Sequence, residues 1–454
     1  MLNFLNKLNS IVWGVPTLLV IFFTGVILTL RTNFFQIRFF KKAFKTFFQK
    51  RRDAHGAQLT PLQSVSTALS ATMGTGNIVG VAGAIALGGP GAVFWMWVSA
   101  AFCMIIKFSE IALSIHYREQ GADGSYSGGV MYYIKNGLPR NFAPLGTVFC
   151  ICGVIAAFGV GNMTQINTMS ASVSALARTV FDLSPKSDFF VKFSVGVLCA
   201  FCCCLILKND RSIGKFCEKI FPVMTLLYIV VTTLAIALNY QKIPLAFYDI
   251  FVGAFNPKGV TGGAVGSAFV ALRFGMSRGV FSNEAGLGTA PTVYACSKGD
   301  EVSLGFLGIM EVFIDTIVVC TLTALTVLCA GDITFGIDYA ADITFNALSS
   351  VFGKNIIFIF CPVVCFFAIS SVIGWGLYGS KFAAFLLGNN FKRVFLVIFV
   401  LAQIPAAVFR AEVIWLLAEI LNGFMILPNI TALLFLTNKV ADITCEYKRK
   451  LQDK

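Results

Sequence analysis

The stretch ATMGTGN at residues 71–77 is the most informative part of the sequence, because it places two glycines inside a long apolar run, 60–87. Glycine in a helix interior costs about 1 kcal/mol relative to Ala and tolerates unwound backbone. A second apolar run, 262–292, contains the stretch FGMSRG at 274–279, again close to its midpoint. The sequence therefore predicts two helices that are interrupted at similar depths.

The rest of the chain is also strongly apolar. Of its 454 residues, 57% are hydrophobic and 13% are charged, which is about half the usual charged share of a soluble domain. A soluble domain cannot bury that much apolar surface, so an ordinary soluble enzyme, a disordered chain and a small disulfide scaffold are excluded. Long continuous apolar runs favour membrane-spanning helices over a β-barrel.

We predict an all-α polytopic membrane protein with about 11 transmembrane helices. The first helix is expected to stay uncleaved, because its apolar stretch is long and no cleavage site is evident. The predicted spans are 11–30, 60–87, 92–115, 145–174, 193–207, 220–240, 262–292, 303–330, 355–380, 394–409 and 413–436.

The net charge of +13 follows the predicted topology and does not indicate a nucleic-acid partner. With eleven spans, the connecting segments on one side carry about three times as many Lys and Arg as those on the other, which is the positive-inside pattern. The segments on the basic side are 31–59, 116–140, 208–219, 293–302, 381–393 and 437–454. It predicts a cell-membrane protein with its N-terminus outside and its C-terminus in the cytoplasm. The basic cluster at 38–52 is interpreted as an anchor that contacts anionic lipid, and no obligate protein partner is evident.

The two interrupted runs also align with each other at a fixed offset. An odd number of crossings separates them, so their orientations are opposite, as in inverted-topology repeats. The predicted organisation is an N-terminal helix and basic loop (1–59), two repeats of five spans (60–260 and 261–436) and a basic cytoplasmic tail (437–454). The matching positions are Ala68/Ala271, Leu69/Leu272, Met73/Met276, Gly76/Gly279, Ala82/Ala285 and Gly83/Gly286.

A helix break inside lipid predicts a binding site. Freed N–H groups at the start of the second half-helix suit a carboxylate, and freed carbonyls at the end of the first suit a cation. Unwound backbone at this depth persists only where it lines a cavity or is buried in protein. Two matched breaks therefore predict a midplane site for a small zwitterion and a cation. The alternative for each break is a glycine packing notch, such as Gly76/Gly80.

One apparent catalytic motif does not carry an enzymatic function. The stretch GMSRG at 275–279 matches the G-x-S-x-G motif of serine hydrolases. The chain has only two histidines, His55 and His116, and neither falls near the middle of a predicted span. We therefore expect that the protein is not an enzyme.

Three motifs resemble those of the alanine or glycine:cation symporter family, also described as sodium:alanine symporters or amino acid carrier proteins. They are GTGNI at 74–78 followed by GGPGA at 88–92, YSGGVMYYI at 126–134, and GMSRGVFSNEAGLGTAP at 275–291. Val130 stands where the family usually has proline. The resemblance covers almost the whole chain. It implies a LeuT-type 5+5 inverted repeat plus one N-terminal helix, and sodium-coupled uptake of alanine or glycine by alternating access.

The resemblance also implies the substrate-binding residues. The first broken helix would contribute Thr75, Gly76 and Asn77, and the second broken helix would contribute facing backbone. Gln165 and Trp375 are placed to contact substrate, although an interhelical hydrogen bond and ordinary packing explain them equally well. The residues expected to provide the facing backbone are Phe274, Gly275, Met276 and Ser277.

A coupling sodium ion needs hard oxygen ligands. Ser370 and Ser371 are adjacent hydroxyls in an otherwise apolar span. The resemblance places sodium between this span and the first broken helix, so the carbonyls of Ala71 and Gly74 are expected to complete the site. The alternative is that both hydroxyls bond to carbonyls of their own helix. No other cofactor is expected.

Charged residues within spans are costly and are usually paired or functional. Lys107 and Glu110 are separated by three positions and are expected to form a helix pair. Arg278 and Glu284 are candidates for an inner gate.

Three other functions remain open from the sequence. The first is a transporter that couples to protons in place of sodium, which would use the same architecture. A channel needs a polar filter, which the sequence does not contain. A sensor derived from a transporter needs a sizeable soluble domain, and the loops are short.

Overall fold

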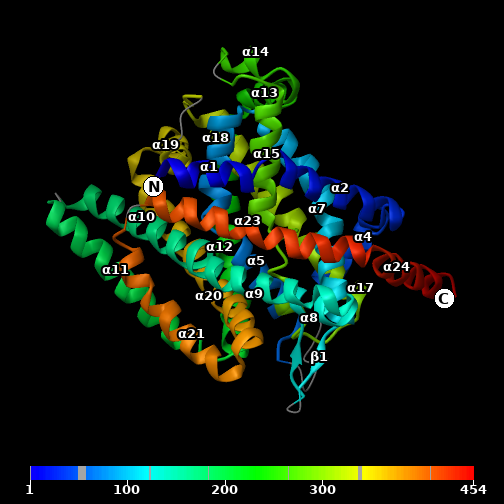
Figure 1. The fold of residues 1–454 in the computed structure, drawn as a ribbon. Helices are drawn as coiled ribbons and strands as arrows, with labels where there is room; N and C mark the ends of the chain where they lie inside the picture. The colour runs from blue at the N-terminus through cyan, green and yellow to red at the C-terminus, as the bar shows by residue number, and fades with distance from the viewer. Residues whose placement is uncertain are drawn as a thin grey trace.

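The computed structural model describes residues 2–49, 58–121, 124–181, 184–263, 265–335, 340–409 and 411–453. Residues 50–52 of the predicted basic cluster lie outside this part. The described chain is almost entirely helical, and its strands are the short β1 (Glu119–Gln120) and β2 (Tyr126–Ser127), which pair as an antiparallel hairpin. The hairpin lies at one end of the molecule, and α13 and α14 lie at the opposite end (Figure 1).

The helical elements of the first half of the chain are α1 (Leu2–Val12), α2 (Val15–Arg31), α3 (Phe35–Arg38), α4 (Phe40–Phe48), α5 (Pro61–Thr72), η1 (Gly76–Gly80), α6 (Val81–Gly88), α7 (Gly91–His116), α8 (Val130–Gly137), η2 (Arg140–Phe142), α9 (Ala143–Phe158), η3 (Gly159–Met163), α10 (Thr164–Val180), α11 (Pro185–Ile206) and α12 (Asp210–Leu238). Those of the second half are η4 (Tyr240–Lys242), α13 (Ile243–Phe255), α14 (Pro257–Thr261), α15 (Ala268–Asn283), α16 (Pro291–Tyr294), α17 (Glu301–Val312), η5 (Phe313–Cys320), α18 (Thr321–Ala330), α19 (Ala340–Phe352), η6 (Lys354–Ile356), α20 (Ile357–Leu387), α21 (Asn389–Leu401), α22 (Gln403–Ala406), α23 (Ala411–Phe435) and α24 (Thr437–Gln452).

Among the described residues, seven helical segments are long and apolar enough to cross a membrane, and the number rises to nine if each of two bent pairs is one span. These segments confirm a polytopic all-α membrane protein. The predicted spans 262–292 and 394–409 form the helices α15, of 16 residues, and α21, of 13 residues. The count of eleven spans therefore stays a prediction.

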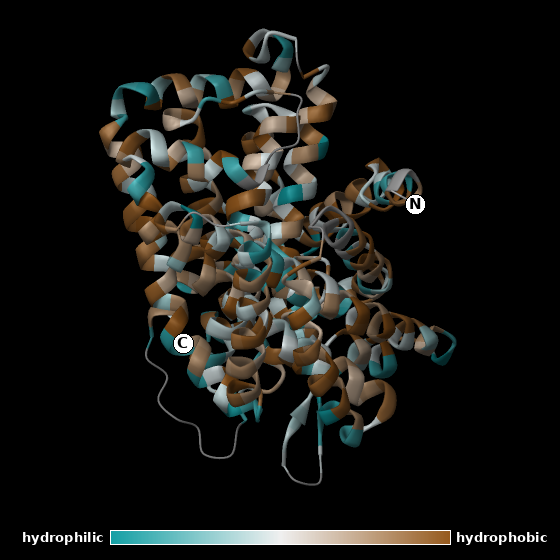
Figure 2. Ribbon diagram, turned by 90° about the vertical axis from the view of Figure 1, so that its left-hand side faces the viewer, coloured by the Kyte–Doolittle hydropathy of each residue, from teal (hydrophilic) through white to brown (hydrophobic). Residues whose placement is uncertain are grey.

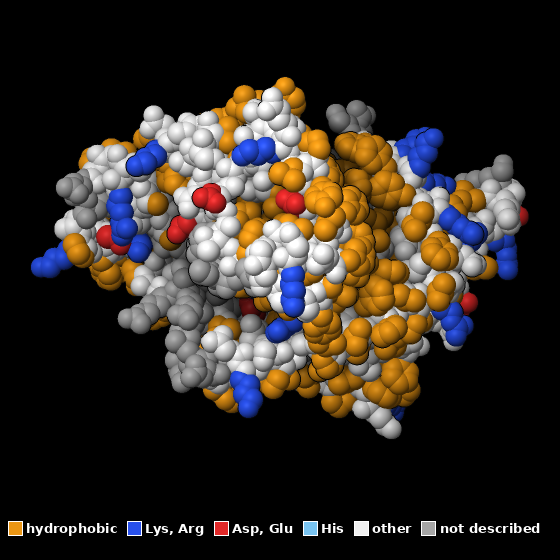
Figure 3. Space-filling model, turned by 90° about the horizontal axis from the view of Figure 1, so that it is seen from above, with side chains coloured by type: hydrophobic (Ala, Val, Ile, Leu, Met, Phe, Trp, Pro, Cys, Tyr) orange, Lys and Arg blue, Asp and Glu red, His pale blue; other side chains and the backbone are white. Residues whose placement is uncertain are grey.

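The outer surface suits a lipid environment. Large apolar side chains of α11 and α12 are strongly exposed, including Phe190, Phe201, Leu226 and Leu238. Hydrophobic residues run along the helices in Figure 2, and hydrophobic side chains form a continuous band across the face seen in Figure 3. Such an exposed apolar surface is stable only where lipid covers it.

The predicted break in the span 60–87 is confirmed. Helix α5 ends at Thr72, the chain unwinds through residues 73–75, and the π-helical turn η1 leads into α6 with a bend of 50° between the two halves. A capping box at Thr60 and Gln63 fixes the other end of α5.

The predicted break at 274–279 is wrong, because α15 runs without interruption from Ala268 to Asn283. Its glycines serve close packing on α7. A Cβ atom at Gly275 would lie 2.2 Å from the Ala92 carbonyl oxygen, and one at Gly279 would lie 2.4 Å from the Ser99 Oγ.

The second interruption lies further along the chain, at residues 284–290. Glu284, Gly286 and Gly288 have φ angles of 54°, 91° and 75°, in the left-handed region that glycine enters at little cost. The chain leaves the helix at Glu284 and re-forms only the short helix α16. The backbone groups freed by this interruption belong to 284–290 and not to 274–277.

Candidate functional site

Gln165 fills the first break. Its Oε1 accepts hydrogen bonds from the Thr75 backbone N–H at 3.2 Å and from the Thr75 hydroxyl at 3.1 Å, and its Nε2 donates to the Val160 carbonyl at 3.1 Å. The π-helical turn η3 directly before α10 leaves the Val160 carbonyl within reach of the amide. The Gln165 side chain thus provides an acceptor for the Thr75 N–H group, which the unwound backbone leaves without a helical partner at the start of the second half-helix.

Asn77 lies on the far side of the break and is held by the second repeat. Its Nδ2 donates to Asp315 Oδ1 at 2.6 Å and to Ser282 Oγ at 3.0 Å, while its carbonyl accepts from the Thr323 hydroxyl at 2.9 Å. The sequence alone gave no reason to join Asn77 to Asp315 or Ser282. A buried polar side chain at the break is a signal that it needs a partner, but it does not identify one.

The predicted cation residues come together at the end of α5. The Ser371 hydroxyl lies 2.8 Å from the Ala71 carbonyl and 3.2 Å from the Ser70 carbonyl. A Cβ atom on Gly74 would lie 2.6 Å from Ser371 Oγ, so only glycine leaves this approach open. Neutral oxygens that converge at the end of a half-helix fit a sodium ion.

Ser370 differs from its neighbour. Its hydroxyl lies 3.0 Å from the Phe367 carbonyl of its own helix and 3.4 Å from the Ser70 carbonyl. The bond within α20 is the alternative considered for both serines. Ser371 therefore faces the break more directly than Ser370 does.

Residues 274–277, which were expected to face the first break, lie away from it. A Cβ atom at Gly76 would lie 3.7 Å from the Phe281 ring, whereas one at Gly88, at the end of α6, would lie 2.9 Å from the Phe274 Cβ. The two helices run antiparallel. Phe274 therefore packs about 18 Å along α6 from Gly76, and Phe281 and Ser282 are the residues that face the break.

The backbone of residues 274–277 is therefore not available to a substrate. These residues lie inside α15, where the backbone groups bond within the helix. Gly275 packs against Ala92, and Met276 is buried. The prediction that they supply facing backbone at the site is wrong because their glycines allow packing and do not unwind the helix.

Trp375 is buried beside the second unwound segment. Its Nε1–H donates to Glu284 Oε1 at 3.1 Å. A Cβ atom at Gly161 would lie 2.2 Å from the Trp375 Cβ, so the π-helical turn η3 lies directly against this side chain. The ring of Tyr378, which is also buried, lies 5.7 Å away.

The charged residues singled out by the sequence pair differently from expectation. Lys107 lies 3.0 Å from Glu311 of α17 and does not form the predicted ion pair with Glu110. Arg278 lies 2.6 Å from Glu419 of α23, and the structure does not join it to Glu284. The gate role of Arg278 and Glu284 stays a prediction.

Two cavities lie along α20 on either side of the Ser371 position. A cavity of about 120 Å³ reaches Thr75 and includes Val364, and a larger pocket of about 420 Å³ includes Lys381. With a rise of 1.5 Å per residue, Ser371 lies about 10 Å from Val364 and about 15 Å from Lys381. The buried side chains of Trp375 and Tyr378 lie in the second interval, between Ser371 and the larger pocket, and we call this conformation closed for that reason.

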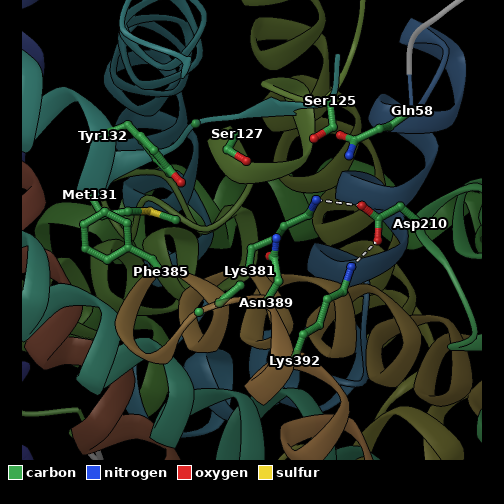
Figure 4. Close-up of a pocket in the computed structure, with 13 residues that line it drawn as sticks. Gln58, Ser125, Ser127, Met131, Tyr132, Asp210, Lys381, Phe385, Asn389 and Lys392 are labelled. Carbon is green, nitrogen blue, oxygen red and sulfur yellow. Dashed lines mark hydrogen bonds and ion pairs between the residues drawn. The ribbon is translucent and has the colours of Figure 1, made fainter. Parts of the chain in front are cut away.

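The larger pocket is polar and contains an ion-pair triad (Figure 4). Asp210, at the start of α12, lies 2.6 Å from Lys381 of α20 and 2.7 Å from Lys392 of α21. Ser125 and Ser127 of the hairpin region line the same pocket. The segments 116–140, 208–219 and 381–393, which the sequence places on one side of the membrane, therefore meet at one end of the molecule.

Comparison with known proteins identifies the family. The family model for the sodium:alanine symporter family matches residues 1–454. The chain belongs to the sodium:alanine symporter family. The sodium/alanine symporter AgcS of Methanococcus maripaludis is 39% identical, over 97% of this chain and 96% of that protein. The amino-acid carrier protein AlsT of Bacillus subtilis is 30% identical, over 94% and 88%.

Solved structures confirm the fold of this family member. The crystal structure of MhsT in complex with L-phenylalanine has a TM-score of 0.60, with 14% sequence identity, over 86% of this chain and 98% of that chain. A manganese transporter from Eremococcus coleocola has a TM-score of 0.51, with 13% identity, over 86% and 80%. The LeuT-type fold is therefore confirmed, and the family member is a membrane transporter and not an enzyme.

Proposed function

We propose that this protein is a symporter that couples the entry of sodium to the uptake of alanine or glycine by alternating access. The observation that carries the proposal is the convergence of the Ser371 hydroxyl and the Ala71 carbonyl beside Gly74 at the first break. This oxygen set ends the first half-helix, where a cation is favoured. Membership of the sodium:alanine symporter family supports the same ion and substrate.

The substrate binds at the other end of the break in this proposal. Its carboxylate takes the N–H groups of Thr75 and Gly76, at the positive start of the second half-helix. The Gln165 amide, which now accepts from Thr75, turns toward the substrate ammonium group. Asn77 keeps the half-helix in place through Asp315, and the proximity of Trp375 to Gly161 favours a small side chain.

The two cavities support a direction of access in this proposal. The cavity that reaches Thr75 serves as the outer path, and the pocket lined by the Lys381–Asp210–Lys392 triad serves as the inner path. The proposed orientation has the N-terminus outside and the C-terminus in the cytoplasm, with lipid around the apolar band. The five-span inverted repeats (60–260 and 261–436) then move relative to each other around the site.

The decisive experiment uses purified protein in lipid vesicles. Labelled alanine and glycine uptake is measured under an inward sodium gradient, under an inward proton gradient, and without a gradient. We expect accumulation only with sodium. Accumulation driven by protons alone would replace sodium with the proton alternative, and equilibration without accumulation would indicate a channel. Binding of alanine without any flux would indicate a sensor.

A further inference from the structure

Five ionisable side chains are buried around the two unwound segments. The five residues are Lys107, Glu110, Glu284, Glu311 and Asp315. Glu284 is 3% exposed, and each of the other four is 0% exposed. The cluster thus contains four carboxyl groups and one ammonium group. Burying an uncompensated charge is so unfavourable that such a group is paired or becomes neutral.

Three of the carboxyl groups have donors that suit a charged form. Glu311 pairs with Lys107 at 3.0 Å and accepts from the Tyr294 hydroxyl at 3.1 Å. Asp315 accepts from Asn77, Ser282 and Thr316 at 2.6–2.9 Å. Glu284 accepts one hydrogen bond on each oxygen, from Thr289 and from Trp375.

Glu110 has the least compensation. Its Oε1 accepts from the Gly286 N–H at 2.9 Å and from the Asn429 amide at 2.5 Å. Its Oε2 is buried and has no hydrogen-bond partner among the described residues. No described Lys, Arg or His forms an ion pair with it, because Lys107 is engaged by Glu311. A negative charge on this carboxyl group would have one oxygen entirely without a donor.

We infer that Glu110 carries a proton in this closed conformation and that the transport cycle exchanges this proton with water. The proposal rests on the proposed function, because it links the proton to the second unwound segment. Glu110 binds the backbone of Gly286, and Asn429 binds both Glu110 and the Gly286 carbonyl at 2.8 Å. A change in the charge of Glu110 therefore acts directly on this segment.

The surroundings of Glu110 determine whether acid or alkaline pH favours the closed conformation. The groups that face Glu110 are Lys107 and Cys103 of α7, Glu311 of α17, Tyr133 of α8 and Asn429 of α23, together with the Gly286 N–H of the unwound segment. The Oε2 atom is buried without a donor, so the neutral acid is the form that this arrangement suits, and contact with water would supply donors to the carboxylate. The closed conformation binds the proton more tightly, so acid pH stabilises it and alkaline pH favours opening.

Infrared spectroscopy tests the proton directly in the purified full-length protein. We expect the wild type at pH 7 to show the C=O stretching band of a buried protonated carboxylic acid, and Glu110→Gln to lose part of it. Glu110→Asp should shift the band, which covers the case in which the Gln variant does not fold. Glu446→Gln, at a 66% exposed side chain, is the matched control and should leave the band intact. An unchanged band in Glu110→Gln would overturn the proposal.

Transport in vesicles tests the coupling. With equal pH on both sides, sodium-driven alanine uptake by the wild type should fall several-fold, up to about tenfold, as the pH decreases from about 8.5 to 5.5. Glu110→Gln mimics the protonated form, so its uptake should be low and nearly independent of pH, whereas Glu446→Gln keeps the wild-type profile. A pH profile that is identical in Glu110→Gln and the wild type would overturn the coupling. If the wild type shows no sodium-driven uptake, the proposed function fails, while the infrared band still reports on the proton.

Discussion

Gln165 and the two serines show how single residues define the site at the first break. Each is a polar side chain in an apolar span, and that contrast is visible in the sequence. Their partners are not visible there, because the Gln165–Thr75 and Ser371–Ala71 contacts join residues far apart in the chain. The sequence therefore identified these polar residues, and the structure distinguishes Ser371 from Ser370.

Replacing Gln165 with Ala should weaken substrate affinity. The change removes the proposed contact between the Gln165 amide oxygen and the substrate ammonium group, and a hydrogen bond to a charged group contributes about 1.5–3 kcal/mol. We expect the KM for alanine to rise by about tenfold or more, measured by labelled uptake into vesicles. Asn167→Ala is the control, because Asn167 on the same helix donates to the Ala406 and Phe409 carbonyls, away from the break. An equal KM in both variants would contradict this role.

The two serines should differ in their effect on sodium. Ser371→Ala removes the hydroxyl that faces the Ala71 carbonyl, so the half-saturating sodium concentration should rise by about tenfold or more. Ser370→Ala should change it less, because the Ser370 hydroxyl bonds to Phe367 within its own helix. The sodium dependence of alanine uptake measures both variants. A Ser371→Ala protein with wild-type sodium dependence would remove the proposed cation site.

At the scale of helices, the sequence located one break and misplaced the other. Both stretches were chosen because glycines interrupt an apolar run, but glycine has two uses in a helix. At 274–279 the glycines admit the backbone of α7, as the position of Gly275 against Ala92 shows. At 284–290 the positive φ angles of Gly286 and Gly288 require glycine for the turn itself. A single sequence does not separate these uses, because both depend on contacts and angles of the folded chain.

Gly286→Ala tests the second break. The substitution places a Cβ atom at a φ of 91°, which costs about 1–2 kcal/mol, in the segment held by Glu110 and Asn429. We expect a lower melting temperature together with a loss of most alanine uptake. Gly263→Ala is the matched control, because Gly263 also has a φ of 91° and its Cβ would meet nothing within 4 Å. Its stability should fall similarly while uptake persists, and equal uptake in the two variants would contradict a special role for Gly286.

At the scale of the whole molecule, composition and charge predicted the fold class and several of the segments that lie together at one end. The apolar excess gave a polytopic helical protein, and the alternation of basic segments placed 116–140, 208–219 and 381–393 on one side, where they meet in one pocket. The ion pairs within that pocket were beyond prediction. Asp210 forms ion pairs with Lys381 and Lys392 because α12, α20 and α21 converge there, and this convergence is a property of the packed bundle.

Asp210→Asn should weaken the closure of this end of the molecule. Removing one partner of a largely buried ion pair costs about 3–5 kcal/mol, and here two lysines lose their partner at once. The conformation in which the outer cavity reaches Thr75 becomes less populated, so the apparent sodium affinity falls with it. We expect the half-saturating sodium concentration for alanine uptake to rise by more than about tenfold. Glu119→Gln is the control, because it breaks the exposed Lys135–Glu119 pair of the same end and should change little. Sodium dependence that is identical in Asp210→Asn and Glu119→Gln would show that the triad does not hold this end closed.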